Sequence, residues 1–88
     1  MSNAIKITVC GHVQGVSFRY SVKQEAEQLG ISGWAKNLPD GCVEVVAIGP
    51  KMQVRQLVEK CKDGPPAAHV ESIKISQTSA NVSGFLIL

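Results

Sequence analysis

The segment from Gly11 to Arg19 joins two runs of residues with opposite hydrophobic periods. Before it, from Ile5 to Val9, apolar and polar residues alternate as in a half-buried strand. After it, from Val22 to Leu29, apolar residues recur at i, i+4 and i+7, as in a helix. The segment GHVQGVSFR is therefore a glycine-containing loop between a strand and a helix N-terminus. This feature restricts the chain to folds that combine sheet and helix.

A loop in this position is well suited to bind an anion. Loop N–H groups can turn inward, and the first N–H groups of the helix lack intrahelical partners. The guanidinium of Arg19 adds a planar fork that matches two phosphate oxygens. No Gly-Lys-Ser/Thr and no G-x-G-x-x-G occurs in the segment, so it fits a small phosphate group better than a nucleotide. The alternative to anion binding is that Gly11 and Gly15 only make tight turns.

The rest of the chain continues the alternation of strands and helices. Strands are predicted over residues 5–10, 32–38, 42–48, around Ile73 and Ile75, and over 85–88; helices are predicted over about 19–29 and 51–62. The second helix carries an apolar stripe of Val54, Leu57, Val58 and Cys61. We expect Ile73 and Ile75 to face one way. The order βαββαβ plus a short strand predicts an α+β, ferredoxin-like split βαβ sandwich, with both helices on one face of an antiparallel sheet. We expect one domain over residues 1–88.

A second motif follows the first predicted helix. The segment from Gly33 to Glu44 reads GWAKNLPDGCVE. Together with the GHVQGVSFR loop, it resembles the acylphosphatase family, which is marked by Gly-x-Val-Gln-Gly-Val-x-Phe-Arg and by Gly-Trp/Tyr-x-x-Asn leading to Asp-Gly-x-Val-Glu. Both marks occur in the right order and at the right separation, and the resemblance covers essentially all 88 residues. The same family is known for the ferredoxin-like fold.

The resemblance implies both an activity and a set of site residues. Family members hydrolyse the carboxyl–phosphate bond of acyl phosphates without a metal, a cofactor or a covalent intermediate. Arg19 would be the catalytic phosphate-binding residue, and Asn37 would orient the attacking water. The substrate-binding loop would comprise Val13, Gln14, Gly15, Val16, Ser17, Phe18 and Arg19. The alternative is that Asn37 is only a turn residue, since it lies just before Leu-Pro-Asp-Gly.

These residue types suit that chemistry. An acyl phosphate is a mixed anhydride with a good carboxylate leaving group, so the protein mainly holds charge and aligns the attack. Backbone N–H groups and Arg19 can hold the three peripheral oxygens. A neutral amide such as Asn37 can position water by one donor and one acceptor contact. No general base is evident near the loop, and the resemblance implies that the bound phosphate takes the proton from the water.

Composition limits the other partners. The net charge is +2, and the seven lysines are scattered without forming a run, which argues against nucleic acid and an anionic membrane. No apolar run approaches the roughly 20 residues that cross a bilayer. The first residues lack the pattern of a signal peptide. We expect a cytoplasmic monomer whose partners are a small acyl phosphate and inorganic phosphate.

The three cysteines, Cys10, Cys42 and Cys61, have no metal-site spacing, and their odd number gives no disulfide framework. Free thiols, buried or half-buried in a reducing compartment, are the favoured interpretation. One disulfide stays open as the alternative in an oxidising environment.

Several side chains near the two motifs have a structural and a functional interpretation. We expect His12 and His69 to be exposed and Phe18 to belong to the core. Gln14 either braces the loop through backbone groups or faces solvent. Trp34 is expected to pack in the core or at an edge, with stacking on a ligand as its alternative. Ser17 occupies a loop position where relatives often have glycine or an aromatic residue.

Two other functions compete with hydrolysis. A ferredoxin-like ligand-binding or RNA-binding module would be non-catalytic. RNA recognition, however, favours aromatics on adjacent strands, and no aromatic follows residue 40 until Phe85. A domain of this type can also work inside a larger carbamoyl-transfer enzyme, and the short length leads us to expect a free-standing protein.

Overall fold

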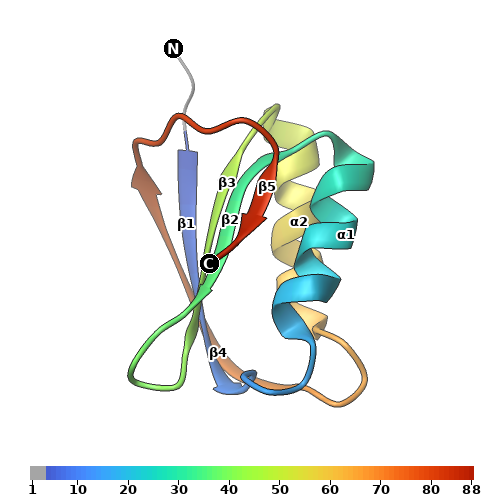
Figure 1. Cartoon of the computed structure of the whole chain (residues 1–88), viewed down its shortest axis with the longest axis vertical. Helices are drawn as coiled ribbons and strands as arrows, with labels where there is room; N and C mark the ends of the chain where they lie inside the picture. Colours follow the sequence, from blue (N-terminus) through green and yellow to red (C-terminus); the bar gives the residue numbers. More distant parts are fainter. Residues whose placement is uncertain (1–3) are drawn as a thin grey trace.

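The computed structural model describes residues 4–88 and contains the predicted order of strands and helices (Figure 1). The elements are β1 (Ala4–His12), α1 (Phe18–Leu29), β2 (Ser32–Asn37), β3 (Val43–Ile48), α2 (Lys51–Asp63), β4 (His69–Thr78) and β5 (Phe85–Ile87). Each predicted element is present, and most ends differ from the prediction by one or two residues. At β1 the two additional residues at the end matter, because the strand continues to His12 and so reaches the glycine loop.

The five strands form one sheet in the order β4-β1-β3-β2-β5. Neighbouring strands are antiparallel, except that β2 and β5 run parallel. Both helices lie against the same face of the sheet (Figure 1). The predicted α+β, ferredoxin-like split βαβ fold is therefore confirmed, with both helices on one face. The sheet is mixed and not purely antiparallel as predicted, because β5 pairs with β2 in parallel.

The core lies between this face and the two helices. In β3, alternate residues Val43, Val45 and Ala47 are fully buried on the helix side, as the period of a strand requires. The helices contribute apolar stripes to the same core: Phe18, Val22 and Ala26 from α1, and Val54, Leu57, Val58 and Cys61 from α2. The stripe predicted for the second helix is thus confirmed.

Gly30 ends α1 as predicted. It adopts φ 72°, and the N–H of Ile31 donates to the carbonyl of Ala26 at 2.8 Å. Glycine takes this left-handed conformation without a steric penalty, so the chain turns directly into β2.

The edge strand β4 departs from the expected burial. Ile73 packs against the core, but Ile75, two residues further along the same face, is 52% exposed. As β4 lies at the edge of the sheet, the two helices do not cover its whole length (Figure 1). The prediction of a shared face holds, and the exposure of Ile75 follows from its position beyond the helices.

Trp34 lies on the sheet face that points away from the helices, because its neighbour Ala35 is buried in the core. Its Nε1 donates to Oε2 of Glu44 on β3 at 3.0 Å. Beside it, Val46 is only 2% exposed although it belongs to the same open face. The indole is therefore held toward β3 on the open face of the sheet and does not belong to the core between the sheet and the helices.

The cysteine prediction was wrong for two of the three residues. Cys10 and Cys42 form a disulfide, with 4.3 Å between their Cα atoms. The register that pairs Val9 with Val43 on β1 and β3 places the next two residues, Cys10 and Cys42, directly opposite one another. Cys61 is a free, buried thiol, as expected, and burial raises its pKa to about 12. Free thiols would have indicated that the protein works in a reducing compartment. A disulfide gives no such indication.

A thiol count tests this cysteine arrangement. The native protein should not react with a thiol reagent, since burial keeps Cys61 protonated and inaccessible. In denaturant without reductant, one thiol per chain should react; after reduction, all three should. Three reactive thiols without reductant would contradict the disulfide.

Reduction should also lower stability. The two cysteines are 32 residues apart, and cross-linking a loop of this length stabilises the folded state by about 3–4 kcal/mol in the chain-entropy model. For a domain of this size, we expect Tm to fall by roughly 10–30 °C in dithiothreitol. The Tm of a Cys10→Ser, Cys42→Ser variant should not respond to the reductant.

Candidate functional site

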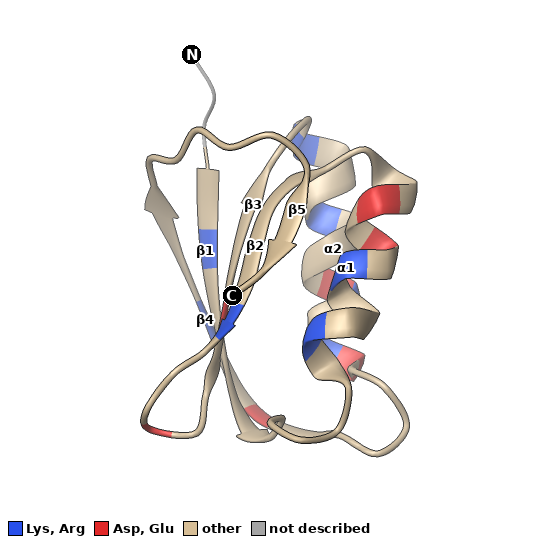
Figure 2. Cartoon of the chain, viewed as in Figure 1, with Lys and Arg blue, Asp and Glu red and all other residues tan. Residues whose placement is uncertain are grey.

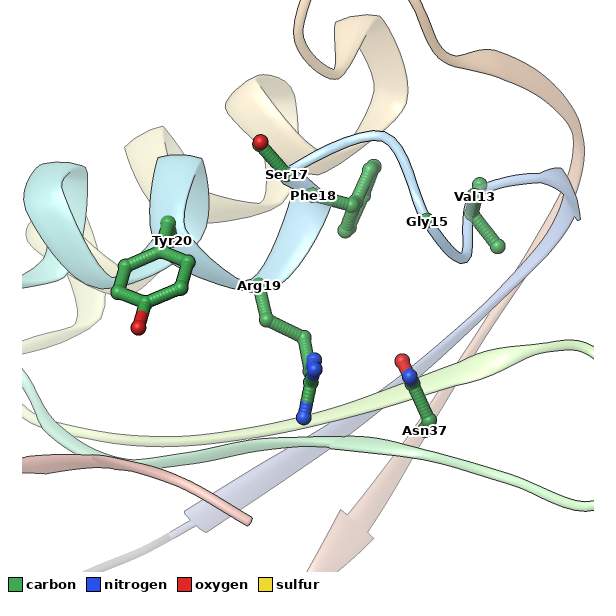
Figure 3. Close-up of a pocket in the computed structure, with 7 residues that line it drawn as sticks. All are labelled: Val13, Gly15, Ser17, Phe18, Arg19, Tyr20 and Asn37. Atoms are coloured by element: carbon green, nitrogen blue, oxygen red, sulfur yellow. The ribbon is translucent and has the colours of Figure 1, made fainter.

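A cavity of about 250 Å³ opens where the loop after β1, the first turn of α1 and the end of β2 meet. Figure 3 shows the side chains around it. The lining residues are Val13, Gly15, Ser17, Phe18, Arg19, Tyr20 and Asn37. Segments about twenty residues apart in the sequence thus contribute to one site.

The loop reaches the cavity through two left-handed residues. Gly15 has φ 76° and Ser17 has φ 63°, and Ser17 is the non-glycine residue with positive φ among those described. Ser17 is also the N-cap of α1, yet its side chain makes no capping hydrogen bond. The first N–H groups of α1 are therefore left available to an anion, which the helix dipole also favours.

Arg19 projects from the first turn of α1 toward β2 (Figure 3). One Nη1 donor is bonded to the backbone carbonyl oxygen of Leu88 at 2.8 Å, which holds the guanidinium in place. A guanidinium has five N–H donors, so this bond leaves others for a ligand. Arg19 thus combines a fixed position with spare donors.

Asn37 ends β2 with its side chain directed into the cavity opposite Arg19 (Figure 3). Its Oδ1 is buried and has no hydrogen-bond partner among the described residues. A buried acceptor without a donor costs about 1–3 kcal/mol. The geometry therefore provides a place for a small donor molecule, such as water, between Asn37 and the loop.

Gln14 joins the loop to the segment that follows Asn37. Its Nε2 donates to the carbonyl oxygens of Leu38 and Cys42, at 2.8 and 2.9 Å. The bracing interpretation of Gln14 is thereby confirmed over the solvent-facing one. The Cys10–Cys42 disulfide connects the same two segments just before the loop. Together these links set the separation between the loop and Asn37.

The turn after Asn37 is itself closed by hydrogen bonds. The N–H of Leu38 donates to the carbonyl of Cys42 at 2.8 Å, and the N–H of Cys42 donates to Oδ1 of Asp40 at 3.0 Å. The expected turn at Asp40 and Gly41 is confirmed.

The cavity contains most, but not all, of the residues predicted for the site. Gln14 and Val16 do not line it, while Tyr20 does and was not predicted. Tyr20 directly follows Arg19 in the first turn of α1, and this adjacency is the sequence signal that could have identified it. Phe18 is 1% exposed, in agreement with its predicted core role.

The lining residues include no carboxylate and no histidine. His12 and His69 are both exposed, as predicted, and lie opposite each other at the ends of β1 and β4. Across residues 4–88, no group of three or more His, Cys, Asp or Glu side chains could hold a metal ion. None of the described helices is long and apolar enough to span a membrane. The chemistry of the site rests on N–H donors, one guanidinium and one amide.

Comparisons with known proteins agree with this arrangement. A family model described as acylphosphatase matches residues 5–87. An acylphosphatase of Thiobacillus denitrificans is 48% identical over 92% of this chain and 91% of its own length. One from Alkalilimnicola ehrlichii is 44% identical over the whole length of both chains. The crystal structure of acylphosphatase from Bacillus subtilis superposes with a TM-score of 0.92, at 38% identity and 98% coverage of each chain.

Binding of inorganic phosphate tests the cavity directly. Arg19→Ala removes a charge-assisted contact, so we expect phosphate affinity to fall by about 10- to 100-fold. Arg19→Lys should restore little, since an ammonium lacks the planar fork. Arg55→Ala is the matched control, because the other arginine of the chain is exposed on α2. Equal affinities of the Arg19→Ala and Arg55→Ala proteins, measured by calorimetry, would remove Arg19 from the site.

Proposed function

Because the chain belongs to the acylphosphatase family, as the match over residues 5–87 shows, we propose that Arg19 and Asn37 carry out its hydrolysis of acyl phosphates. The reaction cleaves the carboxyl–phosphate bond of a small acyl phosphate and releases a carboxylate and inorganic phosphate. The observation that carries the assignment is the buried, unpartnered Oδ1 of Asn37, which faces the same cavity as Arg19.

In this proposal, the phosphoryl group occupies the loop. N–H groups of the loop and of the first turn of α1, with free donors of Arg19, bind its three peripheral oxygens. These donors are already oriented before the substrate arrives, so they stabilise the redistributed charge of the transition state without reorganisation. The left-handed Ser17 and the absence of a capping side chain support this role, since they leave the helix N-terminus free.

The attacking water lies at Asn37. It donates one hydrogen to the buried Oδ1 and can accept one from the amide nitrogen, which directs an oxygen lone pair toward phosphorus. No carboxylate or histidine lines the cavity to take the proton. The bound phosphoryl oxygens accept it instead, which a good carboxylate leaving group allows.

The non-catalytic binding module is the less favoured alternative. An RNA-binding sheet presents several aromatic side chains on its open face, whereas here Trp34 is packed over β3 and Phe85 is buried in the core. Lysines and arginines are distributed over the sheet and both helices (Figure 2). The charge pattern therefore supports a small-molecule substrate over a polyanion.

We also propose that the enzyme acts as a monomer, since a single copy of the chain already brings Arg19, Asn37 and the loop to one cavity. Light scattering after size-exclusion chromatography should give a mass near 9.4 kDa. A stable dimer would contradict this assignment.

Release of phosphate from acetyl phosphate or benzoyl phosphate is the direct test of the activity. A phosphate monoester serves as the control and should be cleaved far more slowly, because its leaving group needs acid assistance. Activity should be unaffected by EDTA and should not require magnesium. Loss of turnover on chelation, restored by a divalent ion, would exclude the metal-free mechanism.

Asn37→Ala should separate turnover from binding. The loop and Arg19 remain in this variant, so phosphate affinity should stay within a few-fold of the wild type. Loss of one preorganised hydrogen-bonding group should lower kcat on the order of 100-fold or more. Arg19→Ala, by contrast, should weaken binding and turnover together.

Circular dichroism and thermal melting must first show that the Asn37→Ala protein is folded, because Asn37 precedes the turn at Asp40 and Gly41. Unchanged kcat with weakened phosphate binding would make Asn37 a binding residue. If neither quantity changes, Asn37 is only a turn residue.

A further inference from the structure

Tyr20 is a large aromatic residue that does not pack into the core. It lines the cavity and is 63% exposed, whereas its neighbours on α1, Phe18 and Val22, are each 1% exposed. Its ring projects from the same helical turn as Arg19 (Figure 3). The structure therefore keeps an aromatic surface available at the mouth of the phosphate-binding cavity.

The position of Tyr20 matches the direction in which the acyl group must leave. In phosphoryl transfer, the attacking and leaving oxygens lie roughly in line on opposite sides of phosphorus. Figure 3 shows Asn37 on one side of Arg19 and Tyr20 on the other. If Asn37 holds the water, the leaving carboxylate lies on the side of Tyr20.

Leu88 accepts the 2.8 Å hydrogen bond from Arg19 through its backbone carbonyl oxygen, but it does not line the cavity. The exposed ring of Tyr20 is therefore the apolar surface next to Arg19 at the cavity. We call this ring the apolar rim.

The charges near the apolar rim do not provide for a second carboxylate on the acyl group. Lys23, one turn beyond Arg19, donates to the carbonyl of Phe85 at 2.8 Å and lies 3.6 Å from the carboxylate of Glu27. Its ammonium is therefore already engaged. An uncharged acyl group suits this environment better than a dicarboxylic one.

We propose that Tyr20 recognises the acyl group, and that the enzyme prefers acyl phosphates with apolar, and above all aromatic, acyl groups. This inference rests on the proposed function, because it takes the direction of departure from the role of Asn37. The phosphoryl group is common to all such substrates, so the loop and Arg19 cannot distinguish between them. Contact of an aromatic acyl group with the Tyr20 ring adds stacking and excludes water from both surfaces.

The test compares kcat/KM for benzoyl phosphate and acetyl phosphate across matched variants. The benzoyl/acetyl ratio of each variant is compared with the ratio of the wild type. The intrinsic difference in reactivity between the two leaving groups is the same in every variant, so it does not affect this comparison. Tyr20→Ser should lower the benzoyl/acetyl ratio on the order of 10-fold, mainly through KM. Tyr20→Phe should restore the wild-type ratio, because it keeps the ring.

Met52→Ser is the control for loss of an exposed apolar side chain, since Met52 is 74% exposed on α2 and does not line the cavity. Its ratio should equal that of the wild type. A Tyr20→Ser enzyme with an unchanged ratio would overturn the proposal.

A binding measurement separates failure of this inference from failure of the proposed function. Benzoylphosphonate and acetylphosphonate carry the same two acyl groups but lack the cleavable oxygen bridge. The ratio of their affinities should fall on the order of 10-fold in Tyr20→Ser, whether or not the protein turns over substrate. An equal loss of affinity for both phosphonates would overturn the recognition by Tyr20. Absence of hydrolysis by the wild type would instead overturn the proposed function.

Discussion

The side-chain amide of Gln14 makes the connection on which the site depends. Its two hydrogen bonds, to the carbonyls of Leu38 and Cys42, join the phosphate-binding loop to the segment that carries Asn37. Without them, the loop and the end of β2 would be joined through the sheet beneath and the nearby disulfide, with no direct contact from the loop itself. The disulfide of Cys10 with Cys42 constrains the same pair of segments covalently. In the proposed mechanism, these two links set the distance between the phosphoryl group in the loop and the water at Asn37, and a catalytic geometry must be held to within a fraction of an ångström.

This rigidity has an energetic cost that a small domain must offset elsewhere. A chain of this size buries only about 60–65% of its unfolded surface, so its margin of stability is narrow. The left-handed Ser17 destabilises the protein by on the order of 1 kcal/mol or more. Close packing of the two helical stripes against the sheet, together with the disulfide, offsets this cost. The strained residue lies in the loop that lines the cavity.

The residues around the cavity have different proposed roles in binding the phosphoryl group and the acyl group. In the proposed mechanism, the loop and Arg19 bind a group that every acyl phosphate shares, so they support the reaction without selecting the acyl group. Selection then falls to the exposed ring of Tyr20, which follows Arg19 in the first turn of α1 and lines the same cavity. The hydrogen bond from Arg19 to the carbonyl oxygen of Leu88 holds the guanidinium at the end of the sheet.

The elements of this chain were predictable because their signals are local. Alternation in β1 and β3, the stripe of α2 and the glycine that ends α1 depend on residues a few positions apart, and Arg19 stands out within its own loop. The role of Asn37 came from the family motif, since locally it resembles a turn residue. Tertiary structure alone decided the disulfide, both hydrogen bonds of Gln14 and the exposure of Ile75. Each of these depends on strand register and on which helix covers which strand, and these join residues tens of positions apart that no local period relates.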